Sequence, residues 1–119
     1  MASRNAETKN QADRAITRGT GNVLADLGYA DAEERQTKLR LAQAINGVIT
    51  RRRLTQSAAA EKLSVNQPKV SALANYKLDG FSVERLMTFL TALDQDVEIV
   101  IRKKPRSRAS ARISVVAAT

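Results

Sequence analysis

The stretch that most constrains this fold is 54–75, which reads LTQSAAAEKLSVNQPKVSALAN. It predicts two short helices joined by a tight turn. Thr55 can cap the first helix and Asn66 the second, because side-chain oxygens at such positions accept the unpaired N–H groups of a first helical turn. Pro68 suits the first turn of the second helix, where a missing backbone N–H breaks no helical hydrogen bond. The apolar residues are spaced so that they can close one small core while the outer faces stay polar.

A small residue lies in the middle of the first predicted helix. Ala59 would let the second helix cross closely and at a steep angle. That arrangement is typical of a helix-turn-helix, in which the second helix enters the major groove of DNA. An ordinary helical hairpin in a small α domain would show the same pattern, so a purely structural role stays open.

Several motifs carry a resemblance to a known family. The motif L-T-Q-x-x-A-A-x-x-L-x-V-x-Q-x-x-V-S-x-L resembles the Cro/cI-type (Xre) helix-turn-helix, and the wider run 21–101 resembles its HigA-type antitoxin branch. Ser64 departs from the family, which usually has glycine in the turn. The resemblance covers about two thirds of the chain. The further matching pieces are N-V-L-A-D-L-G-Y at 22–29, K-L-D-G-F-S at 77–82, R-L-M-T-F-L-T-A-L-D at 85–94 and D-V-E-I-V-I at 96–101.

The helical patterns and the resemblance together predict an all-α, lambda-repressor-like bundle of about five helices with one short C-terminal β-strand. A first short helix is expected at 22–29, ended by Gly28. A long helix should begin at Asp31, a capping residue, and end near the arginines at 51–53. Ser82 should cap the last helix.

Alternating apolar residues near the C-terminus predict the strand. Val97, Ile99 and Ile101 would share one face of a strand near 96–102. A lone strand leaves its backbone unpaired, so its expected partner is the same strand of a second copy, which makes a homodimer. Two recognition helices would then lie about 34 Å apart on a palindromic operator. An extended tail with no partner is the alternative.

The net charge of +8 is unevenly distributed. Residues 102–119 carry six basic side chains and no acidic one, and 35–77 carries nine basic residues against Glu61 alone. A basic block around a recognition helix is the expected phosphate footprint, although a solvated surface would also explain it. We expect a disordered basic N-terminal tail at 1–20, a DNA-binding domain at 21–103 and a basic flexible C-terminal tail at 104–119.

Positions in and beside the two short helices predict the DNA contacts. Gln56 can hold a phosphate at a helix start, and Gln67 can pair bidentately with adenine. Lys69 can reach guanine or a phosphate, and Ala72 can touch a thymine methyl group. The resemblance implies that both glutamines, Lys69 and Ser71 face DNA. The full predicted DNA-binding set is Arg52, Arg53, Thr55, Gln56, Asn66, Gln67, Pro68, Lys69, Ser71, Ala72, Asn75 and Lys77.

The composition argues against several other classes of protein. The chain has no cysteine and no histidine. Disulfides, thiolate chemistry, the usual metal ligand and the usual general base are therefore missing, and we expect neither an enzyme nor a cofactor. Aromatic residues make up 3% of the chain, which argues against base-stacking RNA binders. No apolar run reaches the length of a bilayer span, so we expect a cytoplasmic protein that joins the nucleoid when bound to DNA.

These patterns favour a sequence-specific transcriptional repressor. The HigA-type resemblance further implies an antitoxin that neutralises a ribosome-dependent ribonuclease toxin of the RelE/HigB type and represses its own operon. Two alternatives stay open. One is a stand-alone or phage-type Xre repressor without a toxin, and the other is a protein-binding module with a vestigial helix-turn-helix.

Overall fold

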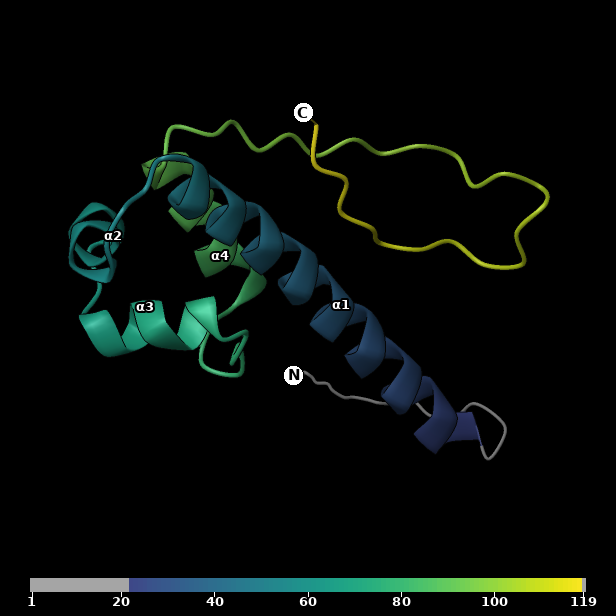
Figure 1. Ribbon diagram of the computed structural model, residues 1–119. Coiled ribbons are helices and arrows are strands. Elements are labelled where there is room, and N and C mark those ends of the chain that lie inside the picture. The colour runs from purple at the N-terminus through teal and green to yellow at the C-terminus, as the bar shows by residue number, and fades with distance from the viewer. Residues whose placement is uncertain (1–21, 119) are drawn as a thin grey trace. The chain divides into compact units, whose positions relative to one another are not determined.

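A computed structural model describes residues 22–118, and the side chains of residues 31–118. The predicted N-terminal tail at 1–20 lies outside this part of the chain. The structure divides into two compact units, with the boundary between Arg35 and Gln36. All regular elements of the described residues are helices, as the predicted all-α class requires (Figure 1). They are α1 (Asn22–Arg51), α2 (Gln56–Leu63), α3 (Gln67–Ala74) and α4 (Val83–Ala92).

The predicted break in the first helical region is wrong. Helix α1 runs without interruption through Gly28 for 30 residues, so the described chain has four helices and not about five. An interior glycine costs a helix only about 1 kcal/mol relative to alanine, whereas a break would give up hydrogen bonds on both sides of it. Asp31 is not a helix cap. Its carboxylate lies 2.7 Å from the guanidinium of Arg35, one turn along the same helix.

The core of the second unit lies where α1, α3 and α4 meet. Ile45 of α1, Leu73 of α3 and Leu86 of α4 are each less than 2% exposed. The rings of Phe81 and Phe89 pack edge to face, with centroids 5.8 Å apart, and are also buried. The main core consists of Leu41, Ala42, Ile45, Val48, Leu63, Leu73, Phe81, Leu86, Phe89, Leu90 and Leu93.

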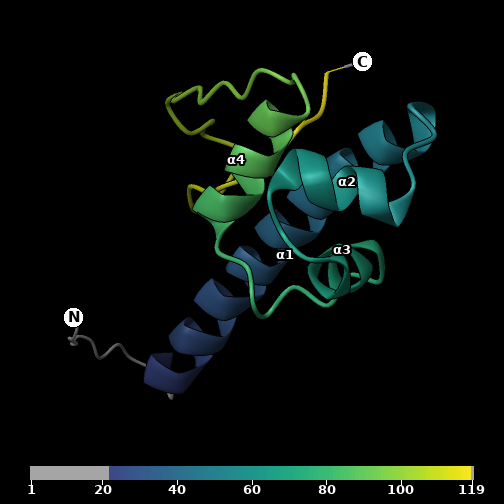
Figure 2. The same ribbon diagram turned by 90° about the vertical axis from the view of Figure 1, so that its left-hand side faces the viewer.

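Helices α2 and α3 form the predicted pair of short helices. Helix α2 is seen along its axis in Figure 1 and from the side in Figure 2, while α3 shows the reverse, so the two cross steeply. Ala59 and Ala60 of α2 are buried against Val70 of α3 in a small cluster of their own. The small side chains permit the close crossing, which confirms the role expected of Ala59.

The predicted C-terminal strand is not formed in the single chain. Residues 22–118 contain no strand, and the segment near 96–102 lacks regular structure. A strand needs a hydrogen-bonded neighbour, and every regular element of this described chain is a helix. Val97 packs half-buried against the main core, whereas Ile99 and Ile101 are 75% and 93% exposed. Their role in dimerisation concerns a second copy and stays a prediction.

No helix within residues 22–118 is both long enough and apolar enough to cross a bilayer. The longest one, α1, has the length of a span, but charged and amide side chains recur along it.

Candidate nucleic-acid interface

The N-terminus of α2 is the first part of the candidate interface. Thr55 caps it as predicted, because its hydroxyl accepts the backbone N–H of Ala58 at 3.0 Å. The backbone N–H groups of Gln56 and Ser57 lie in the first turn, where no carbonyl of the same helix can accept them, and both residues are exposed. An unsatisfied helix start of this kind attracts phosphate oxygens. This geometry suits the phosphate contact predicted for Gln56.

The turn between the two helices depends on a left-handed residue. Ser64 has φ 58° and ψ 43°, and its N–H points to the carbonyls of Ala60 and Glu61. The following N–H, of Val65, donates to the Ala60 carbonyl at 3.0 Å. The tight turn is therefore confirmed. This conformation is sterically unfavourable for serine because of its Cβ atom. Glycine, which the family that the sequence resembles usually has in this turn, has no Cβ and adopts it readily.

The second predicted cap begins α3. The side-chain oxygen of Asn66 accepts the backbone N–H of Lys69 at 3.0 Å. Pro68 occupies the first turn, where its missing N–H costs no helical bond. Gln67 is exposed at the start of the helix, with its amide available to a ligand. The cap leaves Asn66 its amide N–H groups for any contact with DNA.

One face of α3 is buried and the opposite face is open. Val70 and Leu73 are 2% and 1% exposed and point into the domain. Gln67, Ser71 and Asn75 follow one another at intervals of four residues and lie on the opposite side. Gln67 and Asn75 are exposed, and Ser71 is half-buried. The structure thus brings these three predicted residues together in one row.

The two alanines of α3 differ from the prediction in their placement. Ala72 is half-buried against the main core, at the edge of the open face. Ala74 is exposed and shares the open face with Gln67, seven residues earlier. Sequence reasoning missed Ala74, because it follows the buried Val70 by four residues and that spacing predicts a position beside the buried face.

The cation of Lys69 is held at one edge of α3. Its ammonium lies 5.3 Å from the centroid of the Phe81 ring, which is a cation–π contact. A Cβ placed on Gly80 would lie 3.7 Å from the same ammonium. The ring leaves N–H donors of Lys69 available, so the charge is positioned for a phosphate beside the helix.

The chain beyond α3 presents further polar groups. The amide nitrogen of Asn75 donates to the carbonyl of Ser71 at 2.9 Å, which leaves its exposed oxygen available as an acceptor. Tyr76 adopts φ 58° and turns the chain away. Lys77 follows it, fully on the surface, and its N–H donates to the Ala72 carbonyl at 2.9 Å.

The far end of α3 is tied to α1. The amide nitrogen of Asn46 donates to the carbonyl of Leu73 at 3.1 Å. This bond satisfies one of the last helical carbonyls, which have no partner within their own helix. With the Asn66 cap at the start, a side-chain hydrogen bond holds each end of α3.

The two arginines after α1 are placed differently. The guanidinium of Arg52 lies 3.7 Å from the carboxylate of Asp94, next to the end of α4. Arg53 is exposed with φ 55°, three residues before the start of α2, and forms no ion pair with any carboxylate in the described part of the chain. Arg53 is therefore the better placed of the two for a phosphate near the start of α2.

The arrangement can bind a polyanion through amides, hydroxyls, helix N–H groups and cations. Helix α3 carries no acidic residue. No group of three or more His, Cys, Asp or Glu side chains that could hold a metal ion gathers within the described residues. The chemistry on this face is therefore that of recognition by hydrogen bonds and charge.

Comparison with known proteins gives two matches. A family model described as a helix-turn-helix domain matches residues 23–102, which include α2, α3 and α4. A solved structure, provisionally described as an XRE family transcriptional regulator, is 82% identical, with a TM-score of 0.72. That match covers 74% of this chain and 99% of the other. A search of curated proteins found no match.

Proposed function

Because the chain belongs to the Xre family of helix-turn-helix DNA-binding regulators, we propose that it binds one operator sequence through α3 and represses transcription there. The observation that carries the proposal is the open face of α3, where Gln67, Ser71 and Asn75 form one row. A short helix with amide and hydroxyl groups in a row suits the major groove, where each base pair presents a distinct set of donors and acceptors.

Each group of the interface has a role in this proposal. Gln67 pairs with the edge of an adenine, and Asn75 contacts the groove two turns further along. The N–H groups at the start of α2 hold one phosphate, and Arg53 and Lys69 bind phosphates on either side. The phosphate contacts supply affinity and register, and the α3 side chains supply sequence preference.

The proposed repressor acts as a homodimer on a palindromic operator. Val97, Ile99 and Ile101 of two copies would pair as antiparallel strands about a two-fold axis. The exposure of Ile99 and Ile101 supports this, since a second copy would cover them. Two α3 helices would then read half-sites about 34 Å apart.

The antitoxin role belongs to the same proposal and is supported by the resemblance of residues 21–101 to HigA-type antitoxins. The expected partner is a ribonuclease toxin of the RelE/HigB type. Co-expression with the product of the neighbouring gene tests it. A stable complex that restores translation would support the antitoxin role, and a neighbour that does not bind would favour a stand-alone repressor.

The experiment for DNA binding compares two duplexes of about 40 base pairs, long enough for two half-sites one turn apart. One is the DNA directly upstream of the chain's own gene, and the other is a scrambled version. Fluorescence anisotropy should show that the protein prefers the first. Gln67→Ala should weaken this binding about tenfold to a hundredfold, since one bidentate contact contributes about 1–3 kcal/mol, and should leave the scrambled duplex unaffected.

Gln43→Ala is the matched control, because Gln43 is an exposed glutamine of α1 outside α2 and α3. It should bind both duplexes like the unchanged protein. Equal weakening on both duplexes by Gln67→Ala would mean that α3 does not read bases. Equal binding of the unchanged protein to both duplexes would contradict operator recognition altogether.

A further inference from the structure

The segment after α4 holds a second concentration of positive charge. We call residues 102–112 the basic loop; its sequence is RKKPRSRASAR. It contains six cations, and no acidic residue occurs from Ile99 to the end of the chain. The interface on α3 does not use this loop, so its charge needs a separate explanation.

The basic loop is attached to the domain at both ends. Val97 before it and Val115 after it are half-buried against the main core. Inside the loop, the ammonium of Lys104 donates to the carbonyl of Arg108 at 2.7 Å and to that of Pro105 at 3.2 Å. The guanidinium of Arg108 donates to the Ser110 carbonyl at 3.2 Å, and its backbone N–H donates to the Pro105 carbonyl at 3.2 Å. Two of the six cations therefore fix the shape of the loop.

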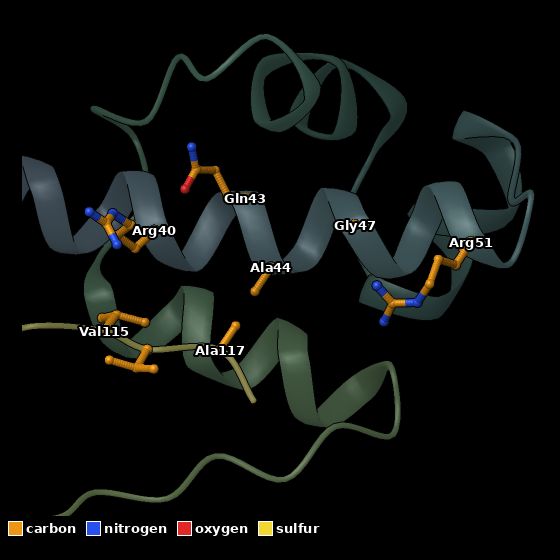
Figure 3. A pocket seen from close by; sticks show the side chains of 8 residues that line it. Arg40, Gln43, Ala44, Gly47, Arg51, Val115 and Ala117 are labelled. Carbon is orange, nitrogen blue, oxygen red and sulfur yellow. The ribbon is translucent and has the colours of Figure 1, made fainter. Parts of the chain in front are cut away.

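The chain returns to α1 after the loop. Figure 3 shows residues 115–117 running along α1, with the methyl groups of Ala44 and Ala117 pointing toward each other. Gly47 lies one turn further along the same side of the helix. A pocket remains between α1 and the returning segment beside Gly47, so the half-buried Val115, packed against the main core, is what anchors the end of the loop.

Four cations of the loop remain available to a ligand. All four are exposed, and none forms an ion pair with a carboxylate of the described residues. The loop has no aromatic or large aliphatic side chain, and such side chains anchor most protein–protein interfaces. Arginine guanidinium groups instead match phosphate oxygens. The four are Arg102, Lys103, Arg106 and Arg112.

The basic loop and α3 lie on opposite sides of the C-terminal half of α1 (Figure 1). A duplex against α3 would leave the loop facing away from it. We propose that the basic loop binds the phosphate backbone of a second DNA duplex, so that one protein holds two DNA segments. This proposal rests on DNA binding by α3 as proposed above.

The test immobilises the upstream duplex on beads, adds the protein and then adds a fluorescent scrambled duplex. Retention of protein reports binding by α3, and capture of fluorescence reports the loop. In the loop variant, Arg102, Lys103, Arg106 and Arg112 are all replaced by serine. Capture of the fluorescent duplex by this variant should fall at least about tenfold. The slope of the logarithm of capture against the logarithm of salt concentration should become shallower by about 3.6, the value for four phosphate contacts. Retention should change less than about threefold at 0.15 M salt, where charges more than about 8 Å from the DNA are screened.

A matched control removes the same charges elsewhere. Residues 1–20 also contain three arginines and one lysine, so Arg4, Lys9, Arg14 and Arg18 are replaced by serine. This control has the net charge of the loop variant and should capture the second duplex like the unchanged protein. An equal loss in both variants would assign the effect to net charge and overturn the proposal.

Two further outcomes would also overturn it. A homodimer could bridge duplexes through its two α3 helices, but the loop variant would then capture the second duplex undiminished. Capture of fluorescent polyglutamate as strongly as DNA would assign the loop to an acidic protein. Gln67→Ala separates a failure of operator binding from a failure of this proposal. The beads should no longer retain this variant, yet it should keep the weak, sequence-independent DNA binding in solution that the loop variant loses.

Discussion

The α2–α3 pair and the C-terminal segment 95–118 are fixed in different ways. In the pair, two side-chain caps and a left-handed turn satisfy backbone groups locally, and a buried alanine–valine cluster packs the two helices together. In the C-terminal segment, two half-buried valines hold the ends, and the side chains of Lys104 and Arg108 donate to nearby carbonyls. The pair presents a rigid surface, whereas the segment presents charges on a tethered loop.

The difference bears on the contact proposed for each region. Reading base edges requires side chains placed to within a fraction of an ångström, which only a packed and capped helix provides. Binding a uniform phosphate backbone tolerates variation, since charge acts over distance. The following substitutions test this contrast, from the largest expected effect to the smallest.

Leu73→Ala should cost about 2–5 kcal/mol of unfolding free energy, because it leaves a cavity in a core where the side chain is 1% exposed. Val115→Ala, in the half-buried anchor of the loop, should cost about 1 kcal/mol or less, because folding buries less apolar surface at this position than at Leu73. Urea unfolding followed by circular dichroism measures both. Similar costs would mean that the C-terminal segment belongs to the cooperative core after all.

Asn66→Ala should cost about 1 kcal/mol, because it removes the acceptor for the Lys69 N–H at the start of α3. The same unfolding measurement applies. Asn75→Ala is the control, since its exposed side chain bonds to a carbonyl at the end of the helix, and it should change stability by less than about 0.5 kcal/mol. If both substitutions cost the same, the cap has no special part in fixing α3.

Ile101→Ser should leave the unfolding of the monomer within about 0.5 kcal/mol, because the side chain is 93% exposed. On the proposed homodimer it should nevertheless weaken self-association in sedimentation equilibrium, since serine cannot replace the covered apolar area. Val116→Ser, at a residue 87% exposed outside the proposed strand, should not. Unchanged association of the Ile101 variant would contradict dimerisation through this segment.

The features that could be predicted from the sequence are those with local causes. Thr55, Asn66 and Ser82 were predicted to cap three helices, and each accepts the N–H three residues ahead. Capping needs a polar side chain and a short span of backbone, both of which are visible in the sequence. The buried face of α3 follows in the same way from the spacing of Val70 and Leu73.

The errors arose where the outcome depends on competing or distant interactions. The sequence predicts a helix end at Gly28, but the free-energy cost of one glycine in a helix is small compared with the hydrogen bonds that a continuous helix keeps. The alternation at 97–101 reads as a strand, but pairing needs an edge that the described chain does not provide. Lys69 stays a predicted contact to guanine or a phosphate, but its position over the Phe81 ring was not predicted, because it depends on a loop twelve residues away that spacing alone cannot place.

The hydrogen bonds from Asn66 and Asn46 at the two ends of α3 have a consequence for the DNA. On the proposed function, a recognition helix held at both ends leaves more of the adjustment needed for contact to the duplex. The bending and twisting stiffness of the operator then enters the affinity directly. On the proposed palindromic operator, base pairs between the half-sites, outside the reach of α3, would contribute to sequence preference through the elastic energy of their stacking.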